Sequence, residues 1–372
     1  MGQRTRIGMY SPYVPEHSGG GERYFFSVAE SLSSHVDVDV LVRPGFGYEN
    51  MEKVREKYQS LFRLNLKKVR FVSSQLGGNM SATQRFLETM CYDVMYCLTD
   101  GSFFLSGASK NIAHIQFPFT FPQNGVINRV KLMNWSVKNA NSLFTKTMVE
   151  RAWNTPIQFV HYPYVDTEAF KPGEKEHIIL SVGRFFTGEK SGLHCKRQDL
   201  LVKMFRTMVD AGEAKRWRLV LIGTIDPGKD NEEYAESVAN LAKGYSVKIF
   251  HDASFNMLQQ YYAHASIYWH AAGFGIDQVQ FPTKVEHFGI SVVEAMASGA
   301  VPIVVNKGGL PEIVEHGVNG FLCETEDDFI GYTRKMIENI QLAKKLRTAA
   351  RQRAGWFSKK RFDETLKEMV CG

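Results

Sequence analysis

Two glutamates and a glycine stand close together in a stretch whose residue types suit an anionic ligand that also carries hydroxyls. Glu286 and Glu294 are separated by seven residues, and Gly289 precedes a short helix predicted over Ile290–Ala297. The free N–H groups and the positive dipole end of such a helix favour an anion. Glu286 lies just before the helix and Glu294 about one turn inside it, so both can accept hydrogen bonds from diol hydroxyls. A single glutamate is more often a solvated surface residue, whereas the whole pattern is specific.

Two basic residues, Arg184 and Lys196, have positions that suit the binding of a phosphate group. Arg184 follows an apolar run that ends at Val182, and Lys196 opens the next predicted helix. A guanidinium offers a fixed fork for phosphate oxygens, and an ammonium adds a compact charge. Gly223 follows a second strand-like run. An isolated Arg or Lys is usually a solvated charge, but a strand end is a functional position.

A glycine cluster and one histidine are the candidates in the first half of the chain. Gly19 and Gly20 follow the first predicted strand and lead into a helix, where they let backbone approach a phosphate or sugar. The spacing is not G-x-G-x-x-G, so this signal alone is weak. His114 stands at the end of a predicted strand. A lone histidine after apolar residues is more often a satisfied core residue, and both interpretations stay open.

Other polar patterns carry less chemistry. Asp37-Val-Asp39 imitates a metal-binding D-x-D signature, but it lies inside an alternating strand and is expected to form a solvent face. His264 and His270 have no metal-ligand spacing and are predicted to be structural. No Ser-His-Asp or Cys-His arrangement is visible, so nucleophilic hydrolysis has no support. No essential metal is expected.

The elements that must position these residues alternate between strands and helices, which predicts parallel α/β sheets. Strand-like runs in the first half lie at 6–10, 36–42, 69–72, 93–97, 111–116 and 142–144, with a helix over 20–34. The pattern restarts after a Pro-bounded linker near 163–172. Further strands are predicted at 177–182, 218–222, 247–250, 267–270 and 301–305, with helices at 199–211, 232–243, 257–265 and 290–297. Three helices follow, at 327–339, 341–353 and 360–369.

Length and composition limit the class of protein. A chain of 372 residues with 44% hydrophobic and 23% charged residues builds two or three globular domains. Every apolar run is far shorter than the ~20 residues of a membrane-spanning helix. Five cysteines without close pairs are typical of a reduced, intracellular protein. No secretory signal is visible, and a net charge of +6 hints at phosphate-bearing ligands or an anionic surface without indicating nucleic acid.

The motifs together resemble those of the family 4 retaining glycosyltransferases of GT-B fold. The resemblance rests on Glu286, Glu294 and the stretch after them to Gly308-Gly-Leu-Pro-Glu-Ile-Val, and covers nearly the full chain. It is carried further by segments near 19–23, 165–167, 182–185, 196–201 and 269–275. It implies two Rossmann-like domains with parallel sheets facing across a cleft: 1–165, on the acceptor side; 166–356, which binds the nucleotide sugar; and a C-terminal helix, 357–372, that crosses back.

The resemblance also implies roles for single residues. Arg184, Lys196 and the helix at Ile290 would hold the donor diphosphate, and Glu294 its ribose. Glu286 would bind the sugar hydroxyls as a catalytic residue, with the backbone at Phe288, Gly289 and Ile290 alongside. From the other domain, His114 would lie near the reacting carbon and Gly19 and Gly20 near the phosphates, while Gly223 would border the base. The implied enzyme transfers a hexose from a nucleoside diphosphate sugar, with GDP-mannose the first expectation, and retains the anomeric configuration without a cofactor.

The acceptor is less well defined by the sequence. A glycan or a lipid-linked glycan is expected, with a cytoplasmic location and peripheral contact with an anionic membrane; no nucleic-acid partner is expected. Basic stretches at 50–71 and 126–137 suit such a surface, or are ordinary amphipathic helices. Open alternatives are a UDP-sugar donor, a sugar phosphorylase or epimerase of the same fold, and a non-catalytic carbohydrate-binding scaffold. A nicotinamide oxidoreductase is the most distant alternative.

Overall fold

Parallel strands form the centre of each half of the molecule in the computed structural model, which describes residues 4–17, 19–43, 50–76, 78, 80–188 and 195–372. The chain divides into two compact units. The first comprises Met1–Pro163 together with Phe362–Gly372, and the second comprises Tyr164–Arg361. The last eleven residues of the chain therefore belong to the N-terminal unit.

The first unit contains a seven-stranded parallel sheet with the strand order β3-β2-β1-β4-β5-β6-β7. Its strands are β1 (Arg6–Tyr10), β2 (Asp37–Val42), β3 (Val69–Ser73), β4 (Val94–Thr99), β5 (Lys110–Ile115), β6 (Val137–Ala140) and β7 (Phe159–Val160). Nearly every residue of β2, β4 and β5 is buried. This burial is expected of parallel strands, which helices cover on both faces.

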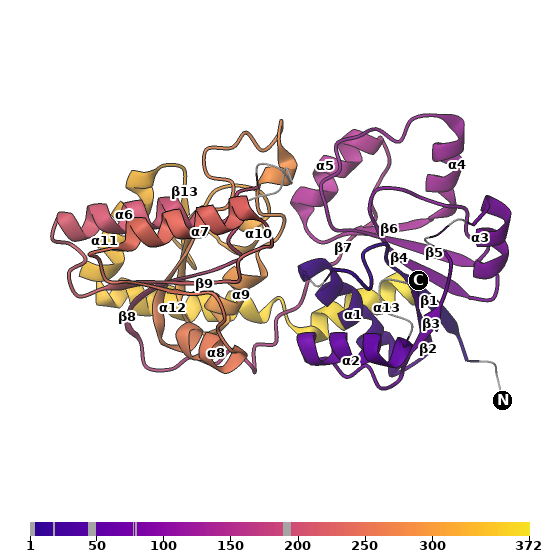
Figure 1. Cartoon of the computed structure of the whole chain (residues 1–372), viewed down its shortest axis with the longest axis horizontal. Coiled ribbons are helices and arrows are strands. Elements are labelled where there is room, and N and C mark those ends of the chain that lie inside the picture. The colour runs from indigo at the N-terminus through magenta and orange to yellow at the C-terminus, as the bar shows by residue number, and fades with distance from the viewer. Residues whose placement is uncertain (1–3, 18, 44–49, 77, 79, 189–194) are drawn as a thin grey trace. The chain divides into compact units, whose positions relative to one another are not determined.

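Figure 1 shows helices on both faces of this sheet. One face carries α1 (Gly20–Ser33), α2 (Met51–Phe62) and α13 (Lys359–Cys371), and the other carries α3 (Ala82–Thr89), α4 (Val126–Asn134) and α5 (Leu143–Trp153). The core on the second face is rich in large rings, including Trp135 and Trp153. The α2 helix buries Val54 and Tyr58, so the basic stretch at 50–71 is an amphipathic helix packed on its own sheet.

The second unit contains a six-stranded parallel sheet with the order β10-β9-β8-β11-β12-β13. The strands are β8 (Glu176–Val182), β9 (Arg218–Ile222), β10 (Val247–Phe250), β11 (Ala265–His270), β12 (Val301–Val305) and β13 (Phe321–Cys323). The helices are α6 (Gln198–Asp210), α7 (Lys229–Ala242), α8 (Phe255–His264), α9 (Ile290–Ala297), α10 (Leu310–Ile313), α11 (Glu326–Glu338) and α12 (Ile340–Gly355). In Figure 1, α6, α7 and α11 cover one face, and α8, α9 and α12 the other.

The predicted α/β class and most of the predicted elements are confirmed. The bounds of β1, β9, β10, β12 and α9 agree with the sequence prediction at both ends. The strand expected at 142–144 is wrong, because Ser142 caps α5: its hydroxyl accepts a hydrogen bond from the N–H of Thr145 at 3.0 Å. No helix within the described ranges is both long and apolar enough to cross a bilayer.

The expectation that Asp39 belongs to a solvent face is also wrong. Its carboxylate is fully buried, and it binds arginines from both neighbouring strands. Arg6 Nε donates to Asp39 Oδ2 at 3.0 Å, and Arg70 Nε donates to Asp39 Oδ1 at 2.7 Å. Burial opposes ionisation of Asp39, but the two guanidinium groups outweigh it and hold its pKa below the usual value. Asp39 thus ties β1, β2 and β3 together electrostatically.

Candidate functional site

The residues of the second unit that are predicted to form the ligand site lie where the strand order of its sheet reverses. From β8 the chain moves outward to β9 and β10, and then returns to β11 on the other side of β8. Ligands of open α/β sheets bind at such a switch point, beyond the carboxyl ends of the strands. Lys196 follows the end of β8, and Glu286 lies in the connection from β11 to α9. The topology therefore brings together residues that are ninety positions apart.

Lys196 and Glu286 are in direct contact. Lys196 Nζ donates to Glu286 Oε2 at 2.5 Å, and the two side chains are only 15% and 11% exposed. The same Glu286 oxygen accepts a hydrogen bond from His270 Nε2 at 2.9 Å. Because a partly buried ion pair is favourable only when further hydrogen bonds support it, the histidine is part of the arrangement.

The sequence argument missed His270, which it placed among the structural histidines. His270 ends β11 and is 1% exposed. Burial lowers its pKa, and the nearby Lys196 charge adds to this effect, although the hydrogen bond to Glu286 opposes it. A neutral imidazole with a proton on Nε2 is the form that donates to Glu286. The signal in the sequence that could have identified His270 is its position at the carboxyl end of a strand, on the same edge of the sheet as Arg184.

Backbone contacts fix the Glu286 loop from the side of β12. Gly309 N–H donates to the carbonyl of Glu286 at 2.8 Å, and Gly308 and Gly309 pack directly on the backbone of residues 286–288. This packing explains the paired glycines in the Gly308-Gly309-Leu310 motif. Backbone contacts therefore fix the loop that carries Glu286, in addition to the side-chain contacts of Glu286.

The α9 helix starts beside this cluster. Its first flanking residue, Gly289, has φ +110°, and a Cβ there would lie 2.8 Å from Leu310 Cδ2, so glycine is required. As a glycine, Gly289 has no side chain of its own to cap the helix start. Phe288 is buried and packs edge-on against Phe357. Ile290 is half-buried, and the amides at 289–290 form a polar helix end suited to an anion.

Glu294 lies one turn further along α9 and is 6% exposed. The hydroxyl of Tyr262, a fully buried residue of α8, donates to Glu294 Oε2 at 3.0 Å. This hydrogen bond orients the carboxylate. The Glu294 carboxylate is therefore held in place, as a group that receives ligand hydroxyls must be.

Arg184 is placed differently from Lys196. Its guanidinium is half exposed and binds both carboxylate oxygens of Asp226, at 2.9 and 3.1 Å. Gly223 lies against the same strand end, because a Cβ at Gly223 would come within 1.9 Å of the Gly183 carbonyl oxygen. The structure thus joins Lys196, Glu286 and His270 directly, and gives Arg184 a separate acidic partner.

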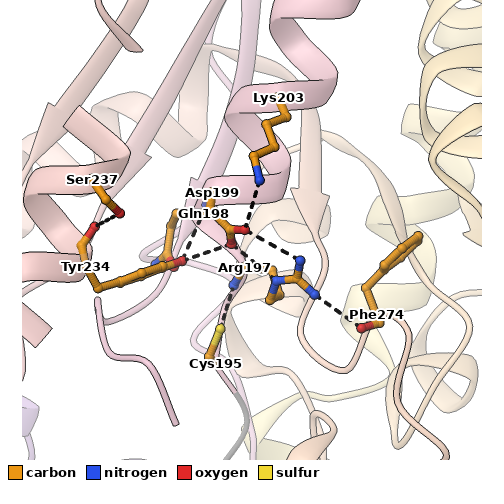
Figure 2. A network of polar contacts seen from close by, with 8 residues as sticks. All are labelled: Cys195, Arg197, Gln198, Asp199, Lys203, Tyr234, Ser237 and Phe274. Carbon is orange, nitrogen blue, oxygen red and sulfur yellow. Dashed lines mark hydrogen bonds and ion pairs between the residues drawn. The ribbon is translucent and has the colours of Figure 1, made fainter. Parts of the chain in front are cut away.

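A polar network holds the segment on which Lys196 stands, as Figure 2 shows. Gln198 Nε2 donates to the carbonyls of Gly183 and Arg184, both at 3.1 Å. Tyr234 of α7 donates to Gln198 Oε1 at 3.0 Å, and Asp199 binds the side chain of Arg197, which has φ +55°. These contacts fix the start of α6 against the end of β8, and with it the position of Lys196.

In the first unit, the predicted residues also lie near a switch point, between β1 and β4. Gly19 precedes α1, and its N–H donates to Glu22 Oε2 at 2.6 Å. Gly20 begins α1 and is exposed. The next residue, Gly21, lies close to the side chain of Gln116. The glycine loop and the end of β5 are therefore neighbours within this unit.

His114 is completely buried in a network of side chains. Its Nδ1 donates to Asn139 Oδ1 at 2.5 Å, its Nε2 lies 2.8 Å from the side-chain amide of Gln116, and its ring stacks on Tyr24. Burial lowers the pKa of His114 to about 4, so the ring is neutral at pH 7. A direct contact with substrate would require Gln116 to turn away, and the catalytic role of His114 stays a prediction.

The Tyr24 side of this network reaches the C-terminal segment. The Tyr24 hydroxyl donates to His161 Nδ1, and His161 Nε2 donates to the carbonyl of Phe362 at 2.9 Å. His161 also stacks on the Phe362 ring. The same hydrogen-bonded chain therefore holds His114 in place and attaches residues 362–372 to the first unit.

The described parts of the chain contain no group of three or more His, Cys, Asp or Glu side chains placed to hold a metal ion. The polar groups gathered at the β8–β11 switch point are a cation, the amide end of α9 and two oriented carboxylates. This set can bind a ligand that combines negative charge with hydroxyls.

Residues 166–353, just over half of the chain, match the family described as Glycosyl transferases group 1. The chain belongs to this family. The matched segment contains β8 to α12, and with them Lys196, His270, Glu286 and Glu294. The second unit is thus the domain by which group 1 glycosyltransferases are defined, and the chain is an enzyme of the glycosyltransferase class.

Curated relatives extend the similarity. A GDP-Man:Man(3)GlcNAc(2)-PP-Dol alpha-1,2-mannosyltransferase of Dictyostelium discoideum is 22% identical over 96% of this chain and 82% of its own length. The human protein of the same name is 28% identical over 70% of this chain and 52% of its own length. The alignment thus spans about half of the human relative.

Solved structures show the fold of the whole chain. Anabaena HepE in complex with UDP superimposes with a TM-score of 0.72 at 18% identity, covering 99% of both chains. Sucrose-phosphate synthase from Thermosynechococcus elongatus gives a TM-score of 0.69 at 16% identity, covering 99% of this chain and 98% of its own. Identities this low establish the fold alone, and the fold is GT-B.

Replacing His270 tests whether it orients Glu286. We expect His270→Ala to lower kcat/KM for sugar transfer by roughly ten- to hundredfold, because it leaves a buried carboxylate without one donor. His270→Gln places an amide N–H near the position of Nε2 and should recover most of the activity. Steady-state kinetics of both variants would contradict the assignment if alanine had no effect, or if glutamine were as impaired as alanine.

The buried histidines predict a pH dependence of stability. The unfolded chain binds a proton at His114 near pH 6.5, but the folded one only near pH 4, so protonation favours unfolding throughout that range. The free energy of unfolding should fall by about 3 kcal/mol through this group as the pH drops from 6.5 to 4. Urea unfolding of wild type and His114→Gln across this range measures it. Identical pH dependences would contradict the account.

Proposed function

We propose that this enzyme transfers mannose from GDP-mannose to a hydroxyl of a lipid-linked glycan, with retention of configuration and without a metal. Within its family it would be a family 4 enzyme, with Glu286 and Glu294 as the paired motif. The observation that carries the proposal is the Lys196–Glu286–His270 cluster beside the α9 helix start. Similarity to two proteins named as GDP-mannose-dependent mannosyltransferases supports the choice of donor.

The cations and the helix start would hold the donor diphosphate. Lys196 is already oriented by Glu286, and the amides at Gly289 and Ile290 lie at the start of α9. Arg184 would add its fork by exchanging Asp226 for phosphate oxygens. As the bond to the diphosphate breaks, negative charge grows on the leaving oxygen, where preorganised positive groups lower the barrier.

The carboxylates would recognise hydroxyls. Glu286 lies beside the cluster and would bind hydroxyls of the donor sugar, while Glu294, oriented by Tyr262, would bind the ribose. Gly223 would border the base. From the first unit, Gly19 and Gly20 would approach the phosphates, and His114 the sugar. Closure of the two units on the substrates would be required before reaction.

The reaction we propose needs no nucleophile from the protein. The bond between the sugar C1 and the diphosphate oxygen breaks, and a bond from C1 to the acceptor oxygen forms on the same face. The acceptor proton passes to the leaving diphosphate oxygen. Glu286, Lys196 and His270 would then act by positioning and by charge, which accounts for retention without a covalent intermediate.

A UDP-sugar is the second candidate donor. The similar structures include Anabaena HepE with UDP and with UDP-glucose, so this fold accommodates that nucleotide in a relative. The names of the relatives, which contain Man(3)GlcNAc(2)-PP-Dol, support a lipid-linked glycan as the acceptor. A lipid-linked acceptor stays in a bilayer, so the enzyme would work in peripheral contact with a membrane surface.

Conversion of Glu286 to glutamine tests the site directly. Glu286→Gln removes the charge but keeps the shape, whereas alanine would also leave two buried donors without an acceptor. We expect transfer from GDP-mannose to a lipid-linked oligosaccharide to fall by at least about a hundredfold, with a thermal midpoint close to that of wild type. Chromatography of the labelled product measures the loss, with EDTA present in one series.

Glu326→Gln is the matched control, since Glu326 is an exposed glutamate at the start of α11 in the same unit. It should retain full activity. Unchanged transfer by Glu286→Gln would remove this residue from the site. Activity abolished by EDTA and restored by a divalent cation would contradict the metal-free mechanism, and sugar 1-phosphate formed from added phosphate would identify a phosphorylase.

A further inference from the structure

The first unit exposes an unusual number of apolar side chains on two helices. Among the described residues, fourteen large apolar side chains are exposed, and nine of them lie between residues 86 and 143. On α4, Val126, Ile127, Val130 and Met133 are 80%, 71%, 49% and 78% exposed. Single exposed apolar residues are normal in soluble proteins, but a concentration of this kind marks an interaction surface.

The exposed residues of α4 lie on one face of the helix. Their positions follow the spacing of three and four that places side chains on the same side. The opposite side of the segment is anchored by Leu132 and Trp135, which are 2% and 0% exposed. The segment is therefore anchored on its inner side by Leu132 of the helix and by Trp135 directly after it.

The α3 helix extends this face. Phe86, Leu87 and Met90, at the end of α3, are 41%, 60% and 55% exposed. The loop between β4 and β5 contacts both helices: Asn134 of α4 exchanges hydrogen bonds with Ser106, at 2.8 and 3.1 Å, and Gly107 N–H donates to Thr89 of α3 at 2.8 Å. Figure 1 shows α3 and α4 on the same face of the first sheet. We call these seven apolar residues of α3 and α4 the α3–α4 face.

The charge around α4 has one sign, whereas α3 carries one cation, Arg85, and one anion, Glu88. Residues 101–149 contain five Lys or Arg and no Asp or Glu. Lys138 is buried, and the other four, Lys110, Arg129, Lys131 and Lys146, are half-buried at the surface. A segment that combines exposed apolar side chains with exclusively basic charge is complementary to a bilayer, where apolar residues enter the acyl boundary and cations meet anionic headgroups.

We propose that the α3–α4 face docks on the surface of a bilayer that contains anionic lipids. This inference deepens the proposed function, because a lipid-linked acceptor is reached from such a surface. It differs from the sequence-based expectation in its location: the basic stretch at 50–71 uses its apolar residues Val54 and Tyr58 in the core, whereas the stretch at 126–137 presents its apolar residues outward.

Vesicle flotation with the full chain tests the proposal. Wild type should bind phosphatidylcholine vesicles that contain phosphatidylserine, bind vesicles of phosphatidylcholine alone more weakly, and lose affinity as salt is added. The double variant Ile127→Glu and Met133→Glu replaces two highly exposed side chains, so it should fold normally. We expect it to bind at least about tenfold more weakly, since two carboxylates would have to enter the interface.

Two further variants separate apolar from electrostatic contributions. Lys131→Glu should weaken binding only to the anionic vesicles. Val318→Glu is the matched control, because Val318 is a 46% exposed apolar residue of the second unit, and it should bind as wild type does. Donor hydrolysis in solution, measured without vesicles, should be the same for all of these variants, so a loss of membrane docking is distinguishable from a failure of the donor site.

Three outcomes would overturn the proposal. The first is that wild type floats with neither vesicle, and the second is that the double variant floats as well as wild type. The third is that light scattering shows wild type to be a dimer that the double substitution dissociates, which would make the α3–α4 face an interface between copies of the chain.

Discussion

A single carboxylate oxygen balances the charge at the switch point of the second sheet. Glu286 Oε2 accepts hydrogen bonds from a lysine that follows β8 and from a histidine that ends β11. These parallel strands are neighbours because the order in which strands are added to the sheet reverses after β10. A half-buried ammonium needs a counter-charge, and a buried carboxylate needs several donors. Glu286 is the shared acceptor for Lys196 and His270, and these two hydrogen bonds connect the ends of β8 and β11.

The same balance leaves the site prepared for an anion. Lys196 pairs with Glu286, and α9 begins beside them with backbone amides next to Gly289, which has no side chain to cap them. A bound diphosphate would interact with Lys196, which would stay close to Glu286, and with the amides at the start of α9. No charged group would then be left without a partner in the protein interior. The neutral state of His270 matters here, because it donates a hydrogen bond without adding repulsion to the lysine.

The sequence predicted the strands and helices well where apolar periodicity was strong, as in β9, β12 and α9. It failed where strands are short or polar. β7 and β13 have two and three residues, and β6 contains Lys138 and Asn139, whose burial becomes intelligible only when Asn139 meets His114. Asp39 looked solvent-exposed because its arginine partners are 31 and 33 positions away.

The candidate site was predictable as a set of motifs, but its internal contacts were not. Glu286 and Lys196 were identified from residue type and position, whereas the partnership of His270 with Glu286 depends on the path of the loop from β11 to α9. The roles of Gln198 and Tyr234 were hidden for the same reason, because both act on backbone and side chains brought close by the fold. Long-range hydrogen bonds of this kind leave no periodic trace in a sequence.

Calorimetric titration of the protein with a panel of nucleoside diphosphate sugars, in EDTA, tests the central claim most directly. The account predicts that one nucleotide sugar, GDP-mannose first among them, binds saturably without a metal, and that Lys196→Met weakens this binding at least about tenfold because it removes the cation that Glu286 holds in place. Binding that required a divalent cation, or that was unchanged in Lys196→Met, would contradict it.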